Sequence, residues 1–155
     1  MTTLAAGDPA PDFTLPAPDG GKLSLADFAD RKLVIYFYPK AGTEACTREA
    51  HDFNELRGEF DAAGTSLLGV SPDGVKALGR FKAKHDIGFP LIGDEAHQLI
   101  EAYGIWVEKS MYGRRFMGVE RTSVLIDTKG RIARIWPKVK VAGHAEEVLA
   151  AARAL

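Results

Sequence analysis

The sequence predicts an α/β fold in which a mixed central sheet is flanked by helices. Two short apolar runs, 33–38 (LVIYFY) and 66–70 (SLLGV), have the length and composition of strands buried on both faces. A helical pattern follows each run, and a β-hairpin with a final helix ends the chain. Strands and helices in this order are typical of a three-layer α/β arrangement.

The first predicted elements are an N-terminal β-hairpin and a buried strand. Segments 12–15 and 22–25 flank Asp19-Gly20-Gly21, a composition that favours a tight turn. The strand over 33–38 ends at Pro39, because proline has no N–H group with which to continue a ladder.

A helix is expected next, from about residue 43 to residue 63. Its core-facing positions recur at helical spacing and share one face: Cys46, Ala50, Phe53, Leu56 (or the stem of Arg57) and Phe60. Thr43 suits the N-cap, which places Cys46 at the third helical position. The Thr43 hydroxyl either caps this helix or turns toward the sulfur or a bound ligand, and the local sequence leaves both roles open.

The remaining elements alternate in type along the chain. They are a strand at 66–70, a helix from Pro72-Asp73-Gly74 to about residue 84, a short strand at 90–92, a short helix at 95–103, strands at 122–127 and 131–136 joined as a hairpin, and a helix from Gly143 to Leu155. The segment 104–120 is interpreted as a long functional loop. In such sheets ligands bind beyond the carboxyl ends of the strands, where the 39–43 loop is expected to lie.

Length and composition indicate a single domain over residues 1–155. The hydrophobic fraction of 46% and the charged fraction of 26% are ordinary for a globular protein. We expect a cytoplasmic protein, since neither a signal peptide nor a membrane-spanning run is evident. A formal net charge of −1 argues against nucleic acid as a partner. A basic excess in the last third is either a solvated face or a site for an anion: Lys109, Arg114, Arg115, Arg121, Arg131 and Arg134.

Cys46 is the only cysteine in 155 residues. A single sulfur excludes an internal disulfide, a CxxC pair and a cysteine-rich zinc site, and four scattered histidines provide no metal-ligand spacing. These residues therefore predict no metal site, and we expect no cofactor. Most free cysteines are small buried hydrophobic residues. The start of a helix, however, stabilises a thiolate, so the position suits a partly exposed, reactive sulfur.

The neighbours of Cys46 on its helix limit its chemistry. A cysteine hydrolase needs a histidine base, yet His51 lies about 140° around the helix axis from Cys46 and is expected to point into solvent. A cysteine hydrolase would therefore need one of the histidines distant in sequence as its base: His85, His97 or His144. Glu49 shares the face of Cys46, and its carboxylate disfavours an ionised sulfur unless a cation lies nearby. Arg121 is the best candidate for that cation.

The segment around Cys46 resembles a known active site. Tyr36-Phe37-Tyr38-Pro39-Lys40, followed by Thr43-x-x-Cys46-Thr47-x-Glu49-Ala50, is similar to the PxxxTxxC segment of peroxiredoxins, most closely the Q type, or bacterioferritin comigratory protein. Further matching segments cover most of the chain: Gly7-Asp8-x-Ala10-Pro11-x-Phe13, Leu68-Gly69-Val70-Ser71, Phe89-Pro90-Leu91, Tyr103-Gly104-Ile105-Trp106, Glu108-Lys109-Ser110-Met111-Tyr112-Gly113 and Glu120-Arg121-Thr122-Ser123-Val124-Leu125-Ile126-Asp127.

This resemblance implies a thioredoxin-like fold and a thiol-dependent peroxidase that acts in antioxidant defence and cell redox homeostasis. Cys46 would be the thiolate that attacks the peroxide, and Thr43 would hydrogen-bond the sulfur and the substrate. Arg121 would keep the sulfur ionised and stabilise the departing oxygen, while Pro39 would shield the site from water. Supporting residues would be Glu49, which orients Arg121, and Trp106, which is otherwise a core or pocket-wall aromatic.

The sequence departs from the family pattern in one respect. Many Q-type members have a second, resolving cysteine five residues after the first, where this chain has His51; others have it near Phe81-Lys82. With one sulfur, a sulfenic acid at Cys46 has no partner within the chain. The resemblance then implies hydrogen peroxide and organic hydroperoxides as substrates and an external thiol as reductant: glutathione, thioredoxin or glutaredoxin. We expect a monomer or weak homodimer. The alternative is a peroxide sensor or redox-dependent binding protein using the same cysteine.

Overall fold

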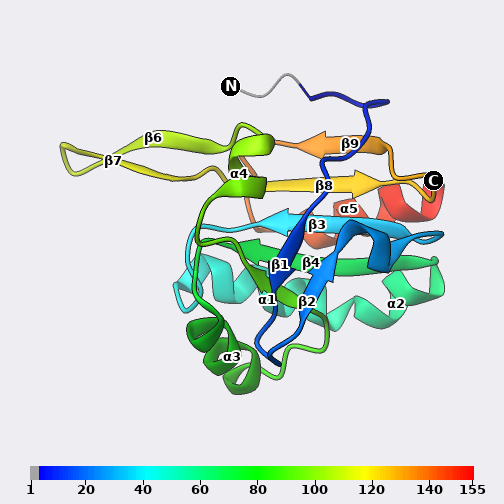
Figure 1. Ribbon diagram of the computed structural model, residues 1–155, viewed down its shortest axis with the longest axis horizontal. Coiled ribbons are helices and arrows are strands. Elements are labelled where there is room, and N and C mark those ends of the chain that lie inside the picture. Colours follow the sequence, from blue (N-terminus) through cyan, green and yellow to red (C-terminus); the bar gives the residue numbers. More distant parts are fainter. Residues whose placement is uncertain (1–3) are drawn as a thin grey trace.

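Five strands form the central sheet, in the order β5-β4-β3-β8-β9 (Figure 1). The computed structural model describes residues 4–155, so the first three residues of the expected domain lie outside it. β3 (Lys32–Phe37) runs parallel to β4 (Thr65–Ser71) and antiparallel to β8 (Thr122–Ile126). β5 (Leu91–Gly93) extends the parallel side and β9 (Ile132–Trp136) the antiparallel side. The sheet is mixed, as the sequence predicts.

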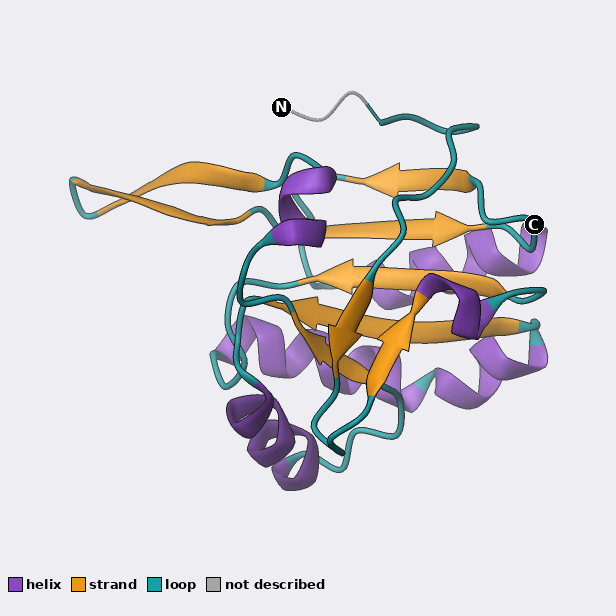
Figure 2. Cartoon of the chain, viewed as in Figure 1, coloured by secondary structure: helices purple, strands orange, loops and turns teal. Residues whose placement is uncertain are grey.

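Helices and a small hairpin cover the two faces of this sheet (Figure 2). One face carries α1 (Glu44–Glu55), α2 (Arg57–Ala62) and α5 (His144–Ala154). The other carries the hairpin of β1 (Thr14–Pro16) and β2 (Lys22–Ser24), a 3-10 turn over Leu25–Phe28, and α4 (Gln98–Ala102). α3 (Val75–Lys84) lies along the β5 edge.

Strand β3 explains why the run over 33–38 is apolar throughout. Val34 and Tyr36 belong to the core cluster shared with α1, α2 and α5, whereas Leu33, Ile35 and Phe37 belong to the cluster on the opposite face. Successive side chains of a strand point to opposite faces, so a strand covered on both sides needs an apolar residue at every position.

The helix expected over 43–63 is two helices, with a break at Leu56. The Leu56 N–H donates to the Phe53 carbonyl in a 3-10 pattern. The Arg57 side chain donates to the Asn54 carbonyl, an acceptor that an unbroken helix would use for a backbone N–H. The Asn54 side chain meanwhile contacts residues beyond α3, because its amide donates to the Asp86 carbonyl and its oxygen accepts the Gly88 N–H. Tertiary contacts therefore interrupt a helix that the apolar pattern alone would continue.

The expectation of a loop over 104–120 is wrong, since most of this segment forms a β-hairpin. β6 (Trp106–Met111) pairs antiparallel with β7 (Arg114–Val119), and the pair projects from the body of the molecule (Figure 1). The turn uses Tyr112 and Gly113, both with positive φ (52° and 77°), as the favoured two-residue hairpin turn requires. Because most of its side chains face solvent, the hairpin lacks the apolar alternation that identifies a half-buried strand.

Candidate active site

Cys46 lies in the first turn of α1, which begins after the loop that follows β3. Thr43 is the N-cap, so Cys46 occupies the third helical position, as predicted. Its side chain belongs to the core cluster that includes Ala50 and Phe53, and the residue is only 1% exposed. The expectation of a partly exposed sulfur is therefore wrong for this conformation, because the first turn of α1 directs the thiol into the core.

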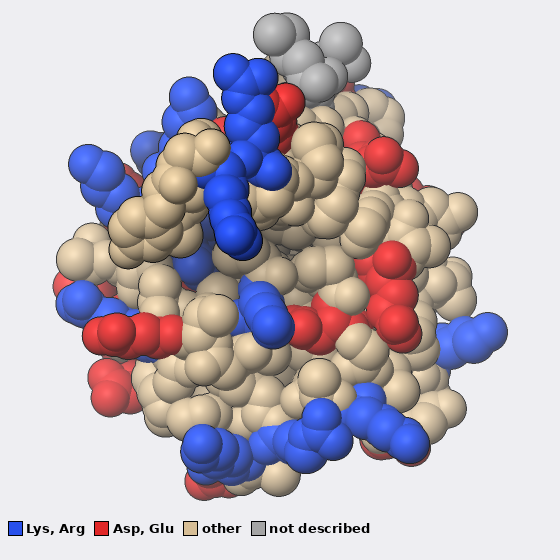
Figure 3. All heavy atoms as spheres, turned by 90° about the vertical axis from the view of Figure 1, so that its left-hand side faces the viewer, with Lys and Arg blue, Asp and Glu red and all other residues tan. Residues whose placement is uncertain are grey.

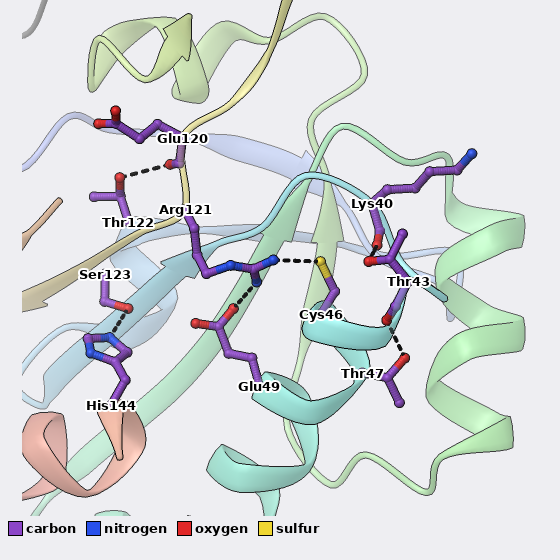
Figure 4. A network of polar contacts seen from close by, with 10 residues as sticks. All are labelled: Lys40, Thr43, Cys46, Thr47, Glu49, Glu120, Arg121, Thr122, Ser123 and His144. Atoms are coloured by element: carbon purple, nitrogen blue, oxygen red, sulfur yellow. Dashed lines mark hydrogen bonds and ion pairs between the residues drawn. The ribbon is translucent and has the colours of Figure 1, made fainter. Parts of the chain in front are cut away.

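Arg121, which immediately precedes β8, reaches this sulfur at the end of the sheet where β3 finishes (Figure 4). Its Nη2 lies 3.3 Å from the Cys46 Sγ, and its Nη1 donates to the Glu49 Oε1 at 2.7 Å. The antiparallel register that pairs Phe37 with Thr122 brings these groups together, because the chain leaves β3 where it enters β8. One guanidinium thus binds a thiol and a carboxylate at the same time.

Burial shifts the pKa of Glu49, and Glu49 in turn shifts the pKa of Arg121. Desolvation raises the pKa of Glu49 to about 7, and the adjacent Arg121 only partly offsets that effect. Burial also opposes the charge of Arg121, but Glu49 and Cys46 outweigh it and raise the pKa of Arg121. The second carboxylate oxygen, Oε2, has no hydrogen-bond partner within residues 4–155. The guanidinium is consequently a permanent positive charge beside the sulfur, whereas its carboxylate partner titrates near neutrality.

The other predicted site residues, Thr43, Pro39 and Trp106, form no hydrogen bond with Cys46 within the described residues. The Thr43 hydroxyl donates to the Lys40 carbonyl at 2.9 Å, so it forms no capping hydrogen bond with α1 and none with the sulfur. Pro39, which is half-buried, begins the same loop. Trp106 stacks on His97, with ring centroids 3.9 Å apart, at the base of the hairpin. Arg121 is therefore in direct contact with both Cys46 and Glu49. Pro39 and Thr43 belong to the loop before α1, and Trp106 lies outside that contact network.

The histidines do not supply a base to the cysteine. The expectation that His51 points into solvent is wrong, since its Nε2 lies 3.1 Å from the Nδ1 of His85 at the end of α3. His144 is buried with its Nε2 2.8 Å from the Ser123 hydroxyl, and His97 packs on Trp106. Across residues 4–155 no histidine is hydrogen-bonded to Cys46. The geometry of a cysteine hydrolase is absent from the described chain.

Sequence reasoning missed Asp73 as a contact of the active-site loop. Its Oδ2 accepts the Ala41 N–H at 2.7 Å and the Ser71 hydroxyl at 2.8 Å. The residue stands in Pro72-Asp73-Gly74, which the sequence indicates only as the start of a helix. The sequence does not predict this hydrogen bond between Asp73, which follows β4, and the 39–43 loop, because the bond depends on how the ends of β3 and β4 lie side by side.

Lys109, one of the basic residues that the sequence offers as part of an anion site, lies on the β6–β7 hairpin and interacts electrostatically with Arg121 and Cys46. Its stem lies across Gly118, where an added Cβ would come within 3.3 Å of the lysine Cδ. Burial lowers the pKa of Lys109, and the nearby Arg121 lowers it further, against the opposing influence of Cys46 and Glu120. Figure 3 views this end of the molecule, where Lys and Arg side chains gather above and below the centre of the face. Asp and Glu side chains also lie beside the centre of this face. The cations that act on Cys46 itself are Arg121 and Lys109.

No set of three or more His, Cys, Asp or Glu side chains that could hold a metal ion occurs within the described residues. None of the helices described over 4–155 is long and apolar enough to cross a membrane.

Comparison with known proteins identifies close relatives. Residues 6–135 match the model of the AhpC/TSA family. A peroxiredoxin Bcp from Xanthomonas campestris is 46% identical over 156 residues, which cover 99% of this chain and 98% of the relative. A peroxiredoxin Bcp from Escherichia coli K12 is 41% identical over 149 residues and covers 96% of each chain.

Solved structures agree with these sequence matches. A peroxiredoxin Q structure from Xanthomonas campestris superimposes with a TM-score of 0.90 at 44% identity, covering 96% of this chain and 97% of its own. A structure of the bacterioferritin comigratory protein of that organism, which its description connects with alkyl peroxide reduction, also gives a TM-score of 0.90 and covers 97% and 98%. The predicted α/β fold with a mixed central sheet is thereby confirmed.

Proposed function

The chain belongs to the AhpC/TSA family and is a peroxiredoxin, and on this premise we propose how its single cysteine performs the reaction. Curated peroxiredoxins that are 41–46% identical over nearly the whole chain support thiol-dependent peroxidase activity. One observation supports the assignment of roles within the site: the Arg121 guanidinium lies between the Cys46 sulfur and the Glu49 carboxylate.

In the first step the Cys46 thiolate attacks one oxygen of a hydroperoxide. An S–O bond forms as the O–O bond breaks, so the sulfur is oxidised to a sulfenic acid and the other oxygen leaves as an alkoxide or hydroxide that takes up a proton. Arg121 stabilises the thiolate before the step and the charge on the departing oxygen during it. Its fixed position matters because the buried surroundings exclude water. Electrostatic interactions are stronger in such a site than they are in water.

The neighbouring residues position this arrangement. Glu49 holds the guanidinium in one orientation through a short, charge-assisted hydrogen bond. The N–H groups of the first turn of α1 have no acceptor within the helix, and they favour negative charge at the sulfur. Thr43 and Pro39 bound the approach to it, and a rotation of the Thr43 hydroxyl from the Lys40 carbonyl would let it bind the peroxide. Trp106 has a supporting role in packing the base of the hairpin.

The second half of the cycle requires an external thiol. The chain contains one cysteine, so the sulfenic acid cannot close an internal disulfide. Hydrogen peroxide and organic hydroperoxides are the proposed substrates, and glutathione, thioredoxin or glutaredoxin the reductants, in a reducing cytoplasm. The protein would act as a monomer or weak homodimer.

Access to the oxidised sulfur requires the chain to move. At 1% exposure, Cys46 is too deeply buried for a second sulfur to approach it in line. The segment that can open is the first turn of α1 with the loop before it, where most residues from Lys40 to Ala45 are exposed. Peroxide, which is small, reacts in the closed conformation; the reductant reacts in the open one.

Mass spectrometry after addition of one equivalent of peroxide tests this function. We expect one added oxygen at Cys46, its replacement by a glutathione adduct when that thiol is present, and complete loss of peroxide consumption in Cys46→Ser. Repeated turnover with a thiol is the expected result. A Cys46→Ser variant that retained activity would overturn the assignment, and a single turnover that ends in a stable disulfide with another protein would favour a sensor.

A further inference from the structure

We propose that a cationic hollow between α3 and the active-site loop binds the carboxylate groups of a small thiol reductant. This inference rests on the proposed function and specifies which class of external thiol completes the cycle. The hollow has a volume of about 370 Å³, within the usual range for sites of small ligands. Its lining comes from two elements: Ala41 and Gly42 of the loop, and Ala77, Arg80, Phe81, Lys84 and His85 at α3 and its end.

The charge of the lining selects for an anion. Arg80 and Lys84 are one helical turn apart, so both side chains project from the same face of α3. No acidic residue lines the hollow, and neither cation forms an ion pair with any residue of 4–155. Lys82 differs, because its ammonium donates to the carbonyls of Ile87 and Phe89. Two of the cations of α3 are thus free to bind a ligand.

The floor of the hollow suits the rest of a small organic thiol. Ala41, Ala77 and Phe81 present apolar surface, on which the methylene groups of a peptide-like thiol can pack. A hollow of this size accepts a tripeptide such as glutathione, whose two carboxylates would meet Arg80 and Lys84. The same volume is too small to receive a folded protein, which would have to bind over the surface.

The hollow also lies where a reducing sulfur is needed. Ala41 packs against the core cluster that contains Cys46, and Gly42 is followed directly by the N-cap of α1. These residues form part of the segment that must open to expose the oxidised sulfur. On the α1 side, His51 is in contact with His85, which lines the hollow. Relatives with a resolving cysteine at the position of His51 would bring their second sulfur to this same neighbourhood.

The chemistry of this step balances without another reagent. The thiol sulfur attacks the sulfenyl sulfur of Cys46, an S–S bond forms and the S–O bond breaks, and the leaving hydroxide combines with the thiol proton as water. A second thiol molecule then attacks the mixed disulfide, which releases Cys46 as a thiol and the reductant as its own disulfide. Two thiols are oxidised for each peroxide reduced.

Reversal of the two charges tests the proposal. The rate of reaction of the sulfenic acid is measured by stopped flow for the variants Arg80→Glu, Lys84→Glu and their combination. Three thiols serve as probes: anionic glutathione, neutral dithiothreitol and cationic cysteamine. We expect the glutathione rate constant to fall about threefold in each single variant and roughly tenfold in the double variant. The dithiothreitol rate should be unchanged and the cysteamine rate should rise.

Two controls keep the result unambiguous. Lys129→Glu makes the same charge change in the exposed turn between β8 and β9 and should leave all three rates unchanged. The glutathione effect should also weaken as salt is added, because exposed charges are screened. Equal changes for all three thiols, or no change for glutathione, would overturn the proposal. Failure of the peroxidase function itself would look different, since peroxide would then form no sulfenic acid at Cys46, or none of the three thiols would reduce it.

Discussion

The Nη2 of Arg121 lies 3.3 Å from the Sγ of Cys46, although 75 positions separate the two residues in the sequence. Their contact follows from the central pairing of β3 with β8, in which Phe37 is opposite Thr122. Glu49 completes the arrangement from the next turn of α1 and holds the guanidinium at its other end. The reactive sulfur therefore depends on a strand pairing as much as on its own helix.

Replacement of Arg121 should slow the reaction with peroxide far more than it changes the fold. Arg121→Met removes the cation beside the sulfur, and we expect the second-order rate constant to fall by a factor of about 10² to 10³. Arg121→Lys keeps a charge but loses the planar fork that binds two partners, so it should recover only part of that loss. Stopped-flow measurement with hydrogen peroxide checks both. Arg134→Met, which removes an exposed guanidinium packed on Trp136, is the matched control and should be nearly as fast as the wild type.

Glu49 should make the free energy of unfolding depend on pH. Its folded-state pKa of about 7 exceeds the ordinary value of 4.5. Between these values the unfolded chain loses the proton that the folded chain retains, so stability should fall as pH rises from about 4.5 to about 7 and change no further above that, by on the order of 3 kcal/mol. Glu49→Gln should remove this dependence. Urea unfolding at pH 5, 6, 7 and 8 measures it, and parallel curves for the two proteins would contradict the prediction.

Gly42 and Gly58 should respond in opposite directions to alanine. Neither has a neighbouring atom within 4 Å of an added Cβ, so crowding plays no part. Gly42 has a φ of +88°, which costs an alanine about 1 kcal/mol or more, whereas Gly58 lies in α2, where alanine is favoured by about 1 kcal/mol. Gly42→Ala should therefore lower the melting temperature and Gly58→Ala should raise it. Shifts of the same sign would show that backbone conformation is not what distinguishes them.

Asp73 should hold the active-site loop closed. Asp73→Ala removes the acceptor of the Ala41 N–H and should cost about 1–2 kcal/mol of stability. Hydrogen exchange should become faster over residues 41–47 but not over β8. In Asp73→Asn one side-chain oxygen remains to accept, so its exchange should lie between those of the wild type and the alanine variant. Uniformly faster exchange along the chain would indicate general destabilisation instead.

The sequence predicts most of the fold because most elements have a buried face. The strands over 33–38 and 66–70 are recognised by their apolar runs and the α1 face by its helical spacing. The β6–β7 hairpin was missed because its side chains face solvent, and an exposed Tyr112-Gly113 turn is a weaker signal than Asn-Gly. The break at Leu56 was missed because it depends on Asn54 contacts with residues beyond α3.

The site was predictable to the extent that its motif is continuous. Cys46, Thr43 and Glu49 lie within one turn or two of each other, and their helical spacing can be computed. Arg121 followed from the need for a cation and from family resemblance, not from local pattern. Three features arise only when distant segments pack: the burial of Cys46, the contact of His51 with His85, and the hydrogen bond that the Ala41 N–H donates to Asp73.

The order of the strands has a consequence for the protein while it is being made. β3 and α1 leave the ribosome early, whereas β8, the strand that Arg121 precedes, is synthesised some 75 residues later. A nascent chain that ends before Arg121 has the cysteine but not its cation. On the proposed role of Arg121, full reactivity should appear only when β8 has joined the sheet, so an unfinished chain should be oxidised more slowly at the residue on which its activity will depend.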